Sequence, residues 1–375
     1  MQLLTVVGAR PQFIKAATVS RAVADSGGVI QEQILHTGQH YDAAMSDQFF
    51  SELGIPQPSF HLGIGGGTHG VNTGRMLEAI EQVLLAGRPD AVLVYGDTDS
   101  TLAGALAASK LKIPVVHVEA GLRSFNRHQP EEQNRVLTDH LADLCFAPTA
   151  TAVLHLKREG IPPERIVRTG DVMADAARIF GDIAEMQGNA LLEAAGLPAM
   201  ELGHEPFVLA TIHRAENTDD PVRLEAILKA LATVAINGVD GCDPLMVLLP
   251  MHPRTKTRIS QYRLQHLLEP LTVVNPLGFL AMVLLERRAS LVVTDSGGVQ
   301  KEAFLQGTPC VTIRTETEWV ELLECGWNRL VDPSDNLAIQ KAMGQQLAIV
   351  TKPLQPQLYG SGHAAEQIVE RLEKM

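Results

Sequence analysis

The sequence has few cysteines and aromatic residues, and it has no long hydrophobic run. Four of its 375 residues are cysteine, none in a Cys-x-x-Cys pair, and 4% are aromatic. A disulfide scaffold is therefore not expected, and reduced, mostly buried thiols fit a cytoplasmic protein. No stretch approaches the roughly 18 apolar residues of a membrane span, and the start MQLLTVVGARPQ carries no basic leader, so we expect no membrane insertion and no signal peptide.

Positive charge is also scarce. The chain has 31 Lys and Arg against 43 Asp and Glu, a formal net charge of −12. Because an acidic surface repels nucleic acid, we expect no nucleic-acid partner, and basic residues gathered at one place should serve a local purpose. The apolar fraction of 45% is ordinary for a globular protein, and the length favours two domains.

Short apolar runs alternate with longer amphipathic stretches, and the alternation restarts in the second half of the chain. The runs lie at 3–8, 33–38, 91–97, 114–121 and 144–149, and again at 206–213, 244–252, 271–276, 290–298 and 309–314. Val- and Leu-rich runs without polar alternation are typical of parallel strands covered on both faces. The pattern predicts an α/β protein with two Rossmann-like parallel-sheet domains facing a cleft.

The same pattern predicts the domain boundaries. Residues 1–185 form the expected N-terminal domain, and residues 206–359 form the C-terminal domain. The stretch 186–205 mixes Gly, Pro, Glu and Ala and is the predicted linker region. The final segment, 360–375, is expected to form a helix that packs back on the N-terminal domain.

Ionisable residues follow many of the predicted strands. In chain order they are Arg10, Lys15, Asp97, Glu119, His213, His252 and Asp295. Open parallel sheets bind their ligands outside the carboxyl ends of the strands. Scattered surface charge would not fall at so many of these ends, so the sequence predicts a ligand site there.

The segment TDSGGVQKEA (294–303) predicts an anion site. A strand ends, Ser-Gly-Gly turns and a helix begins, which points the backbone N–H groups of Ser296, Gly297 and Gly298 at an anion with the aid of the helix dipole. Glu302, further into the helix, is placed to accept hydrogen bonds from ribose hydroxyls. An ordinary helix cap with a tight turn is the structural alternative.

A second Gly-led turn, GARPQFIK (8–15), adds the cations Arg10 and Lys15. Two cations near a second turn make an ordinary helix cap a weaker explanation of the anion-site pattern.

The Gly-rich GIGGGTHG (63–70) is a poor dinucleotide fingerprint, because its spacing departs from Gly-x-Gly-x-x-Gly and no convincing strand precedes it. There is no Walker phosphate loop, and His36 and His40 lie in a loop without metal-site spacing. We therefore expect no NAD, no metal and no other cofactor.

Asp97, Glu119, Glu131 and His213 are the candidate acid/base residues. The carboxylates come from successive segments of the first half, and His213 ends the first strand of the second. Carboxylates that converge in a partly dry site have their pKa values pushed apart, which suits a proton donor and a proton acceptor. Structural alternatives exist, since Asp97 could cap a helix and Glu132 fits a solvated or structural neighbour of Glu131.

A series of motifs resembles the non-hydrolysing UDP-N-acetylglucosamine 2-epimerase family over essentially the whole chain. They are GARPQFIK, GDTDST, HVEAGLRS, PEEQNR, TGDVMAD, HRAEN, MHPRT, TDSGGVQKEA and YGSGHA, in the family's order and spacing. The resemblance implies a glycosyltransferase B-like architecture, a C-terminal UDP-binding domain and a homodimer. It assigns acid/base and charge-stabilising roles to Asp97, Glu119, Glu131 and His213. The candidates for binding UDP or the substrate are Arg10, Lys15, Arg123, His252, Ser296, Gly297, Gly298 and Glu302.

The family's reaction explains why such residues are needed. C2 of the sugar is not next to a carbonyl, so the family eliminates UDP across C1–C2 and adds it back after protonation from the other face. This cycle needs a base, an acid and firm binding of UDP, and it needs neither NAD nor a metal. The sequence does not reveal which carboxylate serves which face.

Three segments depart from the members that act on UDP-N-acetylglucosamine. They are HTGQHYDAAMSDQFF (36–50), GGGTHGVNTGRM (65–76) and TETEWVE (315–321). Together they are similar to the branch that acts on UDP-2,3-diacetamido-2,3-dideoxyglucuronic acid, for lipopolysaccharide O-antigen. The extra carboxylate of that substrate calls for a basic or polar contact, for which His69, Arg75 and Arg123 are candidates. The departures also leave open whether an allosteric substrate site exists.

Other functions remain as alternatives. A hydrolysing relative would release free sugar and UDP, and a glycosyltransferase of the same architecture would need an acceptor and would leave PEEQNR unexplained. A nucleotide-sugar sensor would bind UDP and tolerate Glu131→Gln. Within the epimerases, both the diacetamido-glucuronate and the N-acetylglucosamine substrates stay open.

Overall fold

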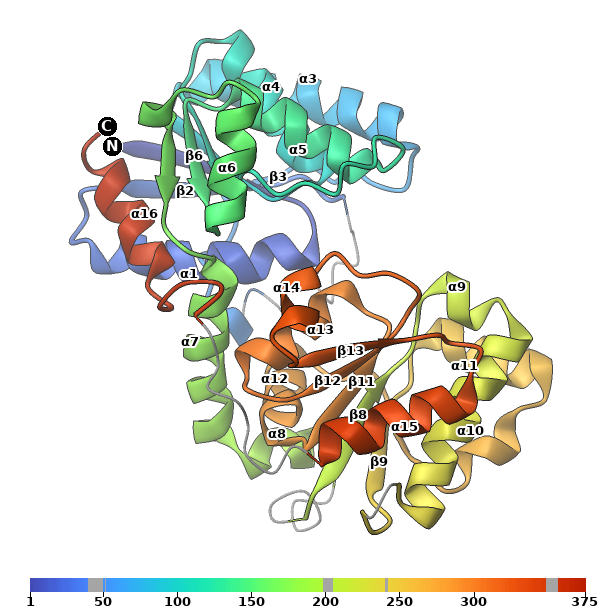
Figure 1. Cartoon of the computed structure of the whole chain (residues 1–375). Coiled ribbons are helices and arrows are strands. Elements are labelled where there is room, and N and C mark those ends of the chain that lie inside the picture. Colours follow the sequence, from blue (N-terminus) through green and yellow to red (C-terminus); the bar gives the residue numbers. More distant parts are fainter. Residues whose placement is uncertain (40–49, 51, 198–204, 240–241, 349–356) are drawn as a thin grey trace. The chain divides into compact units, whose positions relative to one another are not determined.

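The computed structural model describes residues 1–39, 50, 52–197, 205–239, 242–348 and 357–375. The chain divides into two compact units, Met1–Ile179 with Gln357–Met375 and Phe180–Pro356. Each unit contains one parallel sheet with helices (Figure 1). The expected α/β class with two Rossmann-like sheets is therefore confirmed. His40 and most of the segment 36–50 lie outside the described residues.

The sheet of the first unit has seven strands in the order β3-β2-β1-β4-β5-β6-β7. The strands are β1 (Gln2–Val7), β2 (Gln31–His36), β3 (Phe60–His61), β4 (Ala91–Tyr95), β5 (Val115–Val118), β6 (Leu144–Ala147) and β7 (Ile166–Arg168). The strand order reverses where β1 pairs with both β2 and β4. The carboxyl ends of β1, β4 and β5 are therefore neighbours, at the kind of edge where doubly wound sheets bind ligands.

Helices connect these parallel strands. They are α1 (Arg10–Asp25), α3 (His69–Gly87), α4 (Asp99–Lys110), α5 (Pro130–Leu141) and α6 (Ala150–Arg158). After the last strand, α7 (Val172–Gln187) begins in the first unit, and α16 (Ala364–Leu372) comes from the end of the chain. Figure 1 shows α16 in red beside the blue α1, and the two helices pack together. Asp175 on α7 caps α16 by accepting hydrogen bonds from the backbone N–H groups of Ala364 (3.1 Å) and Ala365 (2.8 Å).

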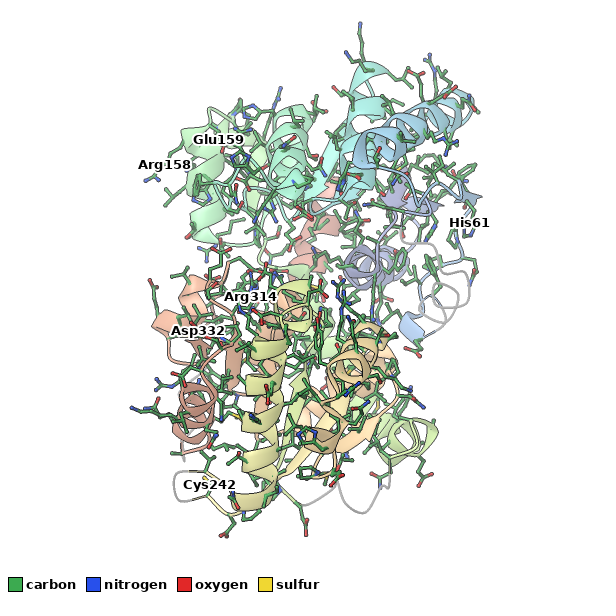
Figure 2. The ribbon with its side chains drawn as sticks, turned by 90° about the vertical axis from the view of Figure 1, so that its right-hand side faces the viewer. His61, Arg158, Glu159, Cys242, Arg314 and Asp332 are labelled. Carbon is green, nitrogen blue, oxygen red and sulfur yellow. The ribbon has the colours of Figure 1, made fainter. Side chains whose placement is uncertain are left out.

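The sheet of the second unit has six strands in the order β10-β9-β8-β11-β12-β13. The strands are β8 (Phe207–Thr211), β9 (Met246–Pro250), β10 (Thr272–Val274), β11 (Leu291–Thr294), β12 (Cys310–Ile313) and β13 (Asn328–Val331). The accompanying helices are α8 (Asn189–Ala194), α9 (Ala215–Thr218), α10 (Pro221–Asn237), α11 (Pro253–Tyr262), α12 (Phe279–Arg288), α13 (Gly297–Leu305), α14 (Val320–Glu324) and α15 (Asn336–Leu347). Figure 2 shows the labelled Arg314, just past β12, and Cys242, ahead of β9, at opposite ends of this unit.

Two features differ from the sequence-based expectation. The division between the units falls inside α7, ahead of the predicted linker 186–205, and α8 lies within that linker. Three strands, β3, β7 and β13, had no predicted counterpart. All three are short, lie at sheet edges and contain His, Arg or Asn, so they lack the continuous apolar run of a strand covered on both faces. Among the described residues, no helix has the length and apolar character to span a membrane.

The turn from β1 into α1 depends on a glycine. A Cβ on Gly8 would collide with the hydroxyls of Thr37 and Ser100, which are buried and hydrogen-bonded to each other at 2.8 Å. We expect Gly8→Ala to lower the free energy of unfolding by about 1–3 kcal/mol, because the buried turn has no room for the methyl group. Urea denaturation measures this change.

Gly74→Ala is the matched control. Gly74 lies inside α3 and a Cβ there would meet nothing within 4 Å. Alanine is more stable than glycine in a helix interior, so the free energy of unfolding of Gly74→Ala should rise by about 0.5–1 kcal/mol. Equal effects of the two substitutions would show that the turn tolerates a side chain.

Candidate active site

Lys15 and Glu119 form a buried ion pair at the carboxyl edge of the first sheet. Lys15 lies on α1, after β1, and its Nζ contacts Oε2 of Glu119, which follows β5. The two side chains are 10% and 11% exposed. Burial alone would lower the pKa of Lys15, but the carboxylates of Glu119, Asp97 and Asp171 outweigh it and raise that pKa. The lysine is therefore held as a cation beside the candidate catalytic carboxylate.

The backbone of Glu119 is strained. Glu119 has a φ of 73°, in the left-handed region that non-glycine residues avoid. Its N–H and that of Ala120 both donate to the carbonyl of Phe146, at 3.1 and 3.0 Å. Such strain is typical of functional sites whose surroundings enforce the geometry.

Gly96, the residue before Asp97, lies against the ion pair. Its φ is 63°, and a Cβ on it would lie 3.1 Å from Oε2 of Glu119 and 3.3 Å from Nζ of Lys15. The end of β4 and the end of β5 therefore meet at the Lys15–Glu119 pair.

Asp97 is held by α5, the helix that begins with PEEQNR. Nη2 of Arg135 lies 2.5 Å from Oδ2 of Asp97, and the Asn134 side chain donates to the Asp97 carbonyl at 2.9 Å. Burial lowers the pKa of Arg135, but the charges of Asp97, Glu132 and Glu119 raise it overall. The charges of the two candidate carboxylates, Asp97 and Glu119, therefore both stabilise the Arg135 guanidinium. Sequence reasoning missed Arg135, although its place four residues after Glu131 on a predicted functional segment was a usable signal.

The adjacent Glu131 and Glu132 have opposite environments. Glu131 is exposed at the start of α5, whereas Glu132 is 1% exposed. Glu132 accepts hydrogen bonds from the backbone N–H groups of Ser124 (2.9 Å) and Phe125 (3.0 Å), and it pairs with Arg135 at 3.1 Å. Glu132 is therefore a structural residue and not a solvated one, which decides between the two interpretations given for it above.

Arg123 also points into the protein. Its side chain is 1% exposed and its guanidinium pairs with Asp139 at 2.7 Å and with Glu159 at 2.6 Å. Figure 2 labels Glu159 at the end of α6. These contacts favour a structural role over the substrate contact predicted for Arg123. His69, by contrast, is 68% exposed beside Asp99 at 2.8 Å, and Arg75 is exposed on α3.

In the second unit, Asp295 organises the loop that carries His213. Asp295 follows β11, is fully buried, and accepts hydrogen bonds from the backbone N–H groups of His213 (3.1 Å) and Arg214 (3.0 Å). The imidazole of His213 lies 3.5 Å from Asp295 and its ring centroid is 5.5 Å from that of His252. Burial and the nearby His213 lower the pKa of His252, which caps α11. The predicted pair of imidazoles is thus brought together at the carboxyl ends of β8 and β9.

The start of α13 has the predicted turn into a helix, but the Ser296 N–H that was predicted to face an anion donates to the Thr294 hydroxyl at 2.9 Å. Ser296 is the N-cap of α13 and the helix begins at Gly297. Arg314 pairs with Glu318 at 2.8 Å, and a Cβ on Gly297 would collide with the Glu318 carboxylate. Trp319 donates its indole N–H to the Gly297 carbonyl at 2.8 Å. The divergent segment TETEWVE therefore lies directly over this helix N-terminus.

Arg10 and Glu302, two further candidates for binding UDP, lie on helices. Arg10 is exposed at the first position of α1, and Glu302 lies within α13. Among the residues that the structure describes, no group of three or more His, Cys, Asp or Glu side chains could hold a metal ion.

Known proteins resemble this chain over its whole length. The sequence profile of the family described as UDP-N-acetylglucosamine 2-epimerase matches residues 22–373. The UDP-2,3-diacetamido-2,3-dideoxy-D-glucuronate 2-epimerase of Pseudomonas aeruginosa is 50% identical over 100% of both chains. The UDP-N-acetylglucosamine 2-epimerase of Methanocaldococcus jannaschii is 41% identical over 99% of both chains. The chain belongs to the UDP-N-acetylglucosamine 2-epimerase family.

Solved structures of this epimerase family share the fold. The M. jannaschii enzyme in complex with UDP-GlcNAc and UDP has a TM-score of 0.84 and 40% identity over 100% of both chains. The Neisseria meningitidis enzyme bound to UDP-GlcNAc has a TM-score of 0.84 and 29% identity, also over 100% of both chains. The expected enzyme class, an isomerase that epimerises UDP-sugars, is confirmed. The catalytic and binding roles of individual residues stay predictions.

The environment of Glu132 predicts a pH-dependent loss of stability in Glu132→Gln. Burial raises the Glu132 pKa, but hydrogen bonds from Ser124, Arg135 and Phe125 lower it overall. A lowered folded-state pKa means that the stabilisation is present at neutral pH and disappears as the pH falls through that pKa. We expect the free energy of unfolding of Glu132→Gln to be about 1–3 kcal/mol lower than that of wild type at pH 7. This difference should shrink below about pH 4.

The neighbouring Glu131→Gln provides the control for stability. Its carboxylate is exposed, so chemical denaturation at the same pH values should find it within about 0.5 kcal/mol of wild type. A Glu132→Gln deficit that persists unchanged at low pH would contradict the role of its ionised form.

Proposed function

We propose that this epimerase inverts C2 of UDP-2,3-diacetamido-2,3-dideoxyglucuronate, giving the manno form. The observation that carries the proposal is the 50% identity, over the full length of both chains, to the P. aeruginosa enzyme named for that substrate. The enzymes named for UDP-N-acetylglucosamine with 40% and 41% identity supply the second candidate substrate. We further propose a cytoplasmic homodimer that supplies surface polysaccharide synthesis, including lipopolysaccharide O-antigen.

The proposed reaction is an elimination followed by the reverse addition. A carboxylate removes the C2 proton, the C2–H electron pair becomes the C1–C2 double bond, and the C1–O bond breaks with its electrons leaving on UDP. A proton is then delivered to the other face of C2 and UDP adds back at C1. Asp97, Glu119 and Glu131 are the proposed acid/base groups, and no cofactor takes part. The cations Lys15 and Arg135 pair with Glu119 and Asp97 and fix the positions of these two carboxylates.

UDP is proposed to bind the second unit. The backbone N–H groups of Gly297 and Gly298 suit a diphosphate at the N-terminus of α13. The Ser296 N–H donates to the Thr294 hydroxyl at 2.9 Å, so we propose that Ser296 contributes its own hydroxyl. His213 and His252 lie at neighbouring strand ends of the same sheet and add donors for the phosphates. Glu302, on α13 of the same unit, completes the proposed nucleotide contacts.

The sugar carboxylate of the proposed substrate needs a polar partner, and His69 is the favoured one. Its ring is held at Nδ1 by Asp99, two residues after Asp97, while most of its surface remains exposed. Arg75 follows it on α3. Arg123 is the weakest of the three candidates because its guanidinium is already paired with two carboxylates.

The deciding experiment incubates the purified protein with each candidate UDP-sugar in D₂O and follows C2 by NMR. We expect epimerisation with solvent deuterium at C2, and faster turnover of the diacetamido-glucuronate. Free sugar with stoichiometric UDP would instead identify a hydrolysing enzyme. Inversion without deuterium, or only with added NAD, would refute elimination and re-addition.

The acid/base roles predict the behaviour of two variants. Glu119→Gln and Glu131→Gln should each lower kcat by about 100-fold or more, because an amide neither donates nor accepts the C2 proton. Their UDP affinity, measured by calorimetry, should stay within about threefold of wild type, since the proposed UDP contacts lie in the other unit.

Glu164→Gln is the control for these variants. Glu164 is exposed and lies just before β7, at the amino end of a strand and so away from the ligand edge. Wild-type kcat in Glu119→Gln and Glu131→Gln, alongside the control, would remove both residues from the mechanism.

A further inference from the structure

Three buried side chains and the partly exposed Glu159 form a chain near the ends of β4 and β5. In order they are His117 on β5, Asp139 on α5, Arg123 and Glu159. His117 and Asp139 lie 2.7 Å apart, Asp139 and Arg123 2.7 Å apart, and Arg123 and Glu159 2.6 Å apart. His117 and Asp139 are fully buried. The Arg123 guanidinium lies between two carboxylates, which lessens the cost of burying these charges.

The two ring nitrogens of His117 have different hydrogen-bond partners. Nε2 lies 2.8 Å from the carbonyl oxygen of Gly96, and a carbonyl only accepts, so Nε2 carries a proton. Nδ1 lies 2.7 Å from Oδ1 of Asp139. The other oxygen of Asp139, Oδ2, accepts from the Gly121 N–H at 3.0 Å and pairs with Arg123. His117 and Asp139 thus connect Gly96 to Gly121.

The Asp139 carboxylate is kept ionised by its neighbours. Burial alone would raise its pKa, but His117 and Arg123 outweigh that effect and hold the pKa below the ordinary value. Asp139 can thus serve as the common acceptor for His117, Arg123 and the Gly121 N–H.

His117 fixes the peptide that leads into Asp97. The Gly96 N–H donates to the carbonyl of Val118 at 3.0 Å, and the Gly96 carbonyl accepts from His117. Both polar groups of Gly96 are therefore bound to β5, the strand that leads to Glu119. A rotation of this peptide would move the backbone of Asp97 and the wall against which Lys15 and Glu119 pack.

Asp139 fixes the other side of the same site. It binds the N–H of Gly121, two residues after Glu119, while the N–H of Glu119 itself is bound to Phe146. The left-handed backbone of Glu119 is thus tied at both ends. One His–Asp pair therefore joins the turn that carries Asp97 to the loop that carries Glu119.

We propose that His117 is a positioning residue for epimerisation, whose Nε2–H bond to the Gly96 carbonyl keeps Asp97 and Glu119 in register with each other. The inference rests on the proposed function, since it concerns the placement of the two proposed acid/base groups. His117 does not touch the substrate and transfers no proton. Removing its bond to Gly96 should lower the rate of the chemical step and leave UDP binding unchanged.

Two substitutions separate the two bonds of His117. An asparagine amide occupies roughly the place of Nδ1, so His117→Asn can keep the Asp139 bond and loses the Gly96 bond. A glutamine amide reaches roughly the place of Nε2, so His117→Gln can keep the Gly96 bond and loses the Asp139 bond. Each variant removes one hydrogen bond and keeps the other, so the two variants separate the contribution of the Gly96 bond from that of the Asp139 bond.

The kinetic test compares kcat, KM and C2 deuterium exchange in these variants. We expect kcat of His117→Asn to fall about 10- to 100-fold, that of His117→Gln to fall several-fold less, and the Kd for UDP to stay within about threefold in both. Equal kcat in the two variants, or wild-type kcat in His117→Asn, would overturn the inference. If wild type itself fails to exchange C2 with any candidate UDP-sugar, the proposed function fails and the inference falls with it.

A second measurement does not depend on any variant folding. In wild-type protein labelled with ¹⁵N-histidine, His117 should show a slowly exchanging ring proton on Nε2. A ring with Nε2 unprotonated would overturn the proposed bond to Gly96.

Discussion

The buried ion pair between Lys15 and Glu119 is the constraint around which the first unit's site is arranged. Neither charge could be buried alone, because each would carry the full desolvation cost without its partner. The pair joins α1, which follows β1, to the end of β5, and it leaves little room beside Gly96, whose φ of 63° also favours glycine. Glu119 has a left-handed backbone where it meets Lys15. Three neighbouring strand ends therefore meet at this one contact.

The second unit uses a buried carboxylate differently. Asp295 gathers backbone N–H groups of the His213 loop, so it shapes the loop instead of facing a cation. Beside it, α13 begins with N–H groups suited to an anion. The first unit thus supplies paired carboxylates and cations, and the second supplies imidazoles and backbone donors. This division is the basis of the proposed roles, proton transfer for the carboxylates of the first unit and diphosphate binding for the second.

Much of the fold was predictable because its central strands are buried on both faces. Ten apolar runs correspond to β1, β2, β4, β5 and β6 and to β8 through β12. The edge strands β3, β7 and β13 were missed because each is short and contains His, Arg or Asn, which interrupts an apolar run. The edge strand β10 was predicted because its Thr-Val-Val lies within the run 271–276. The boundary inside α7 was missed because composition marks loops and gives no sign of a helix that passes from one unit into the next.

The sequence by itself determined the order of the elements, the family, and which ionisable residues follow the strands. Only the tertiary structure decided which of those charges face inward. Glu131 and Glu132 are adjacent and chemically identical, yet one is exposed and the other binds a loop and Arg135. His117 lies in an apolar strand and was not predicted as a site residue, yet it binds Gly96 and Asp139. These outcomes depend on partners far away in the chain, so local pattern carries no record of them.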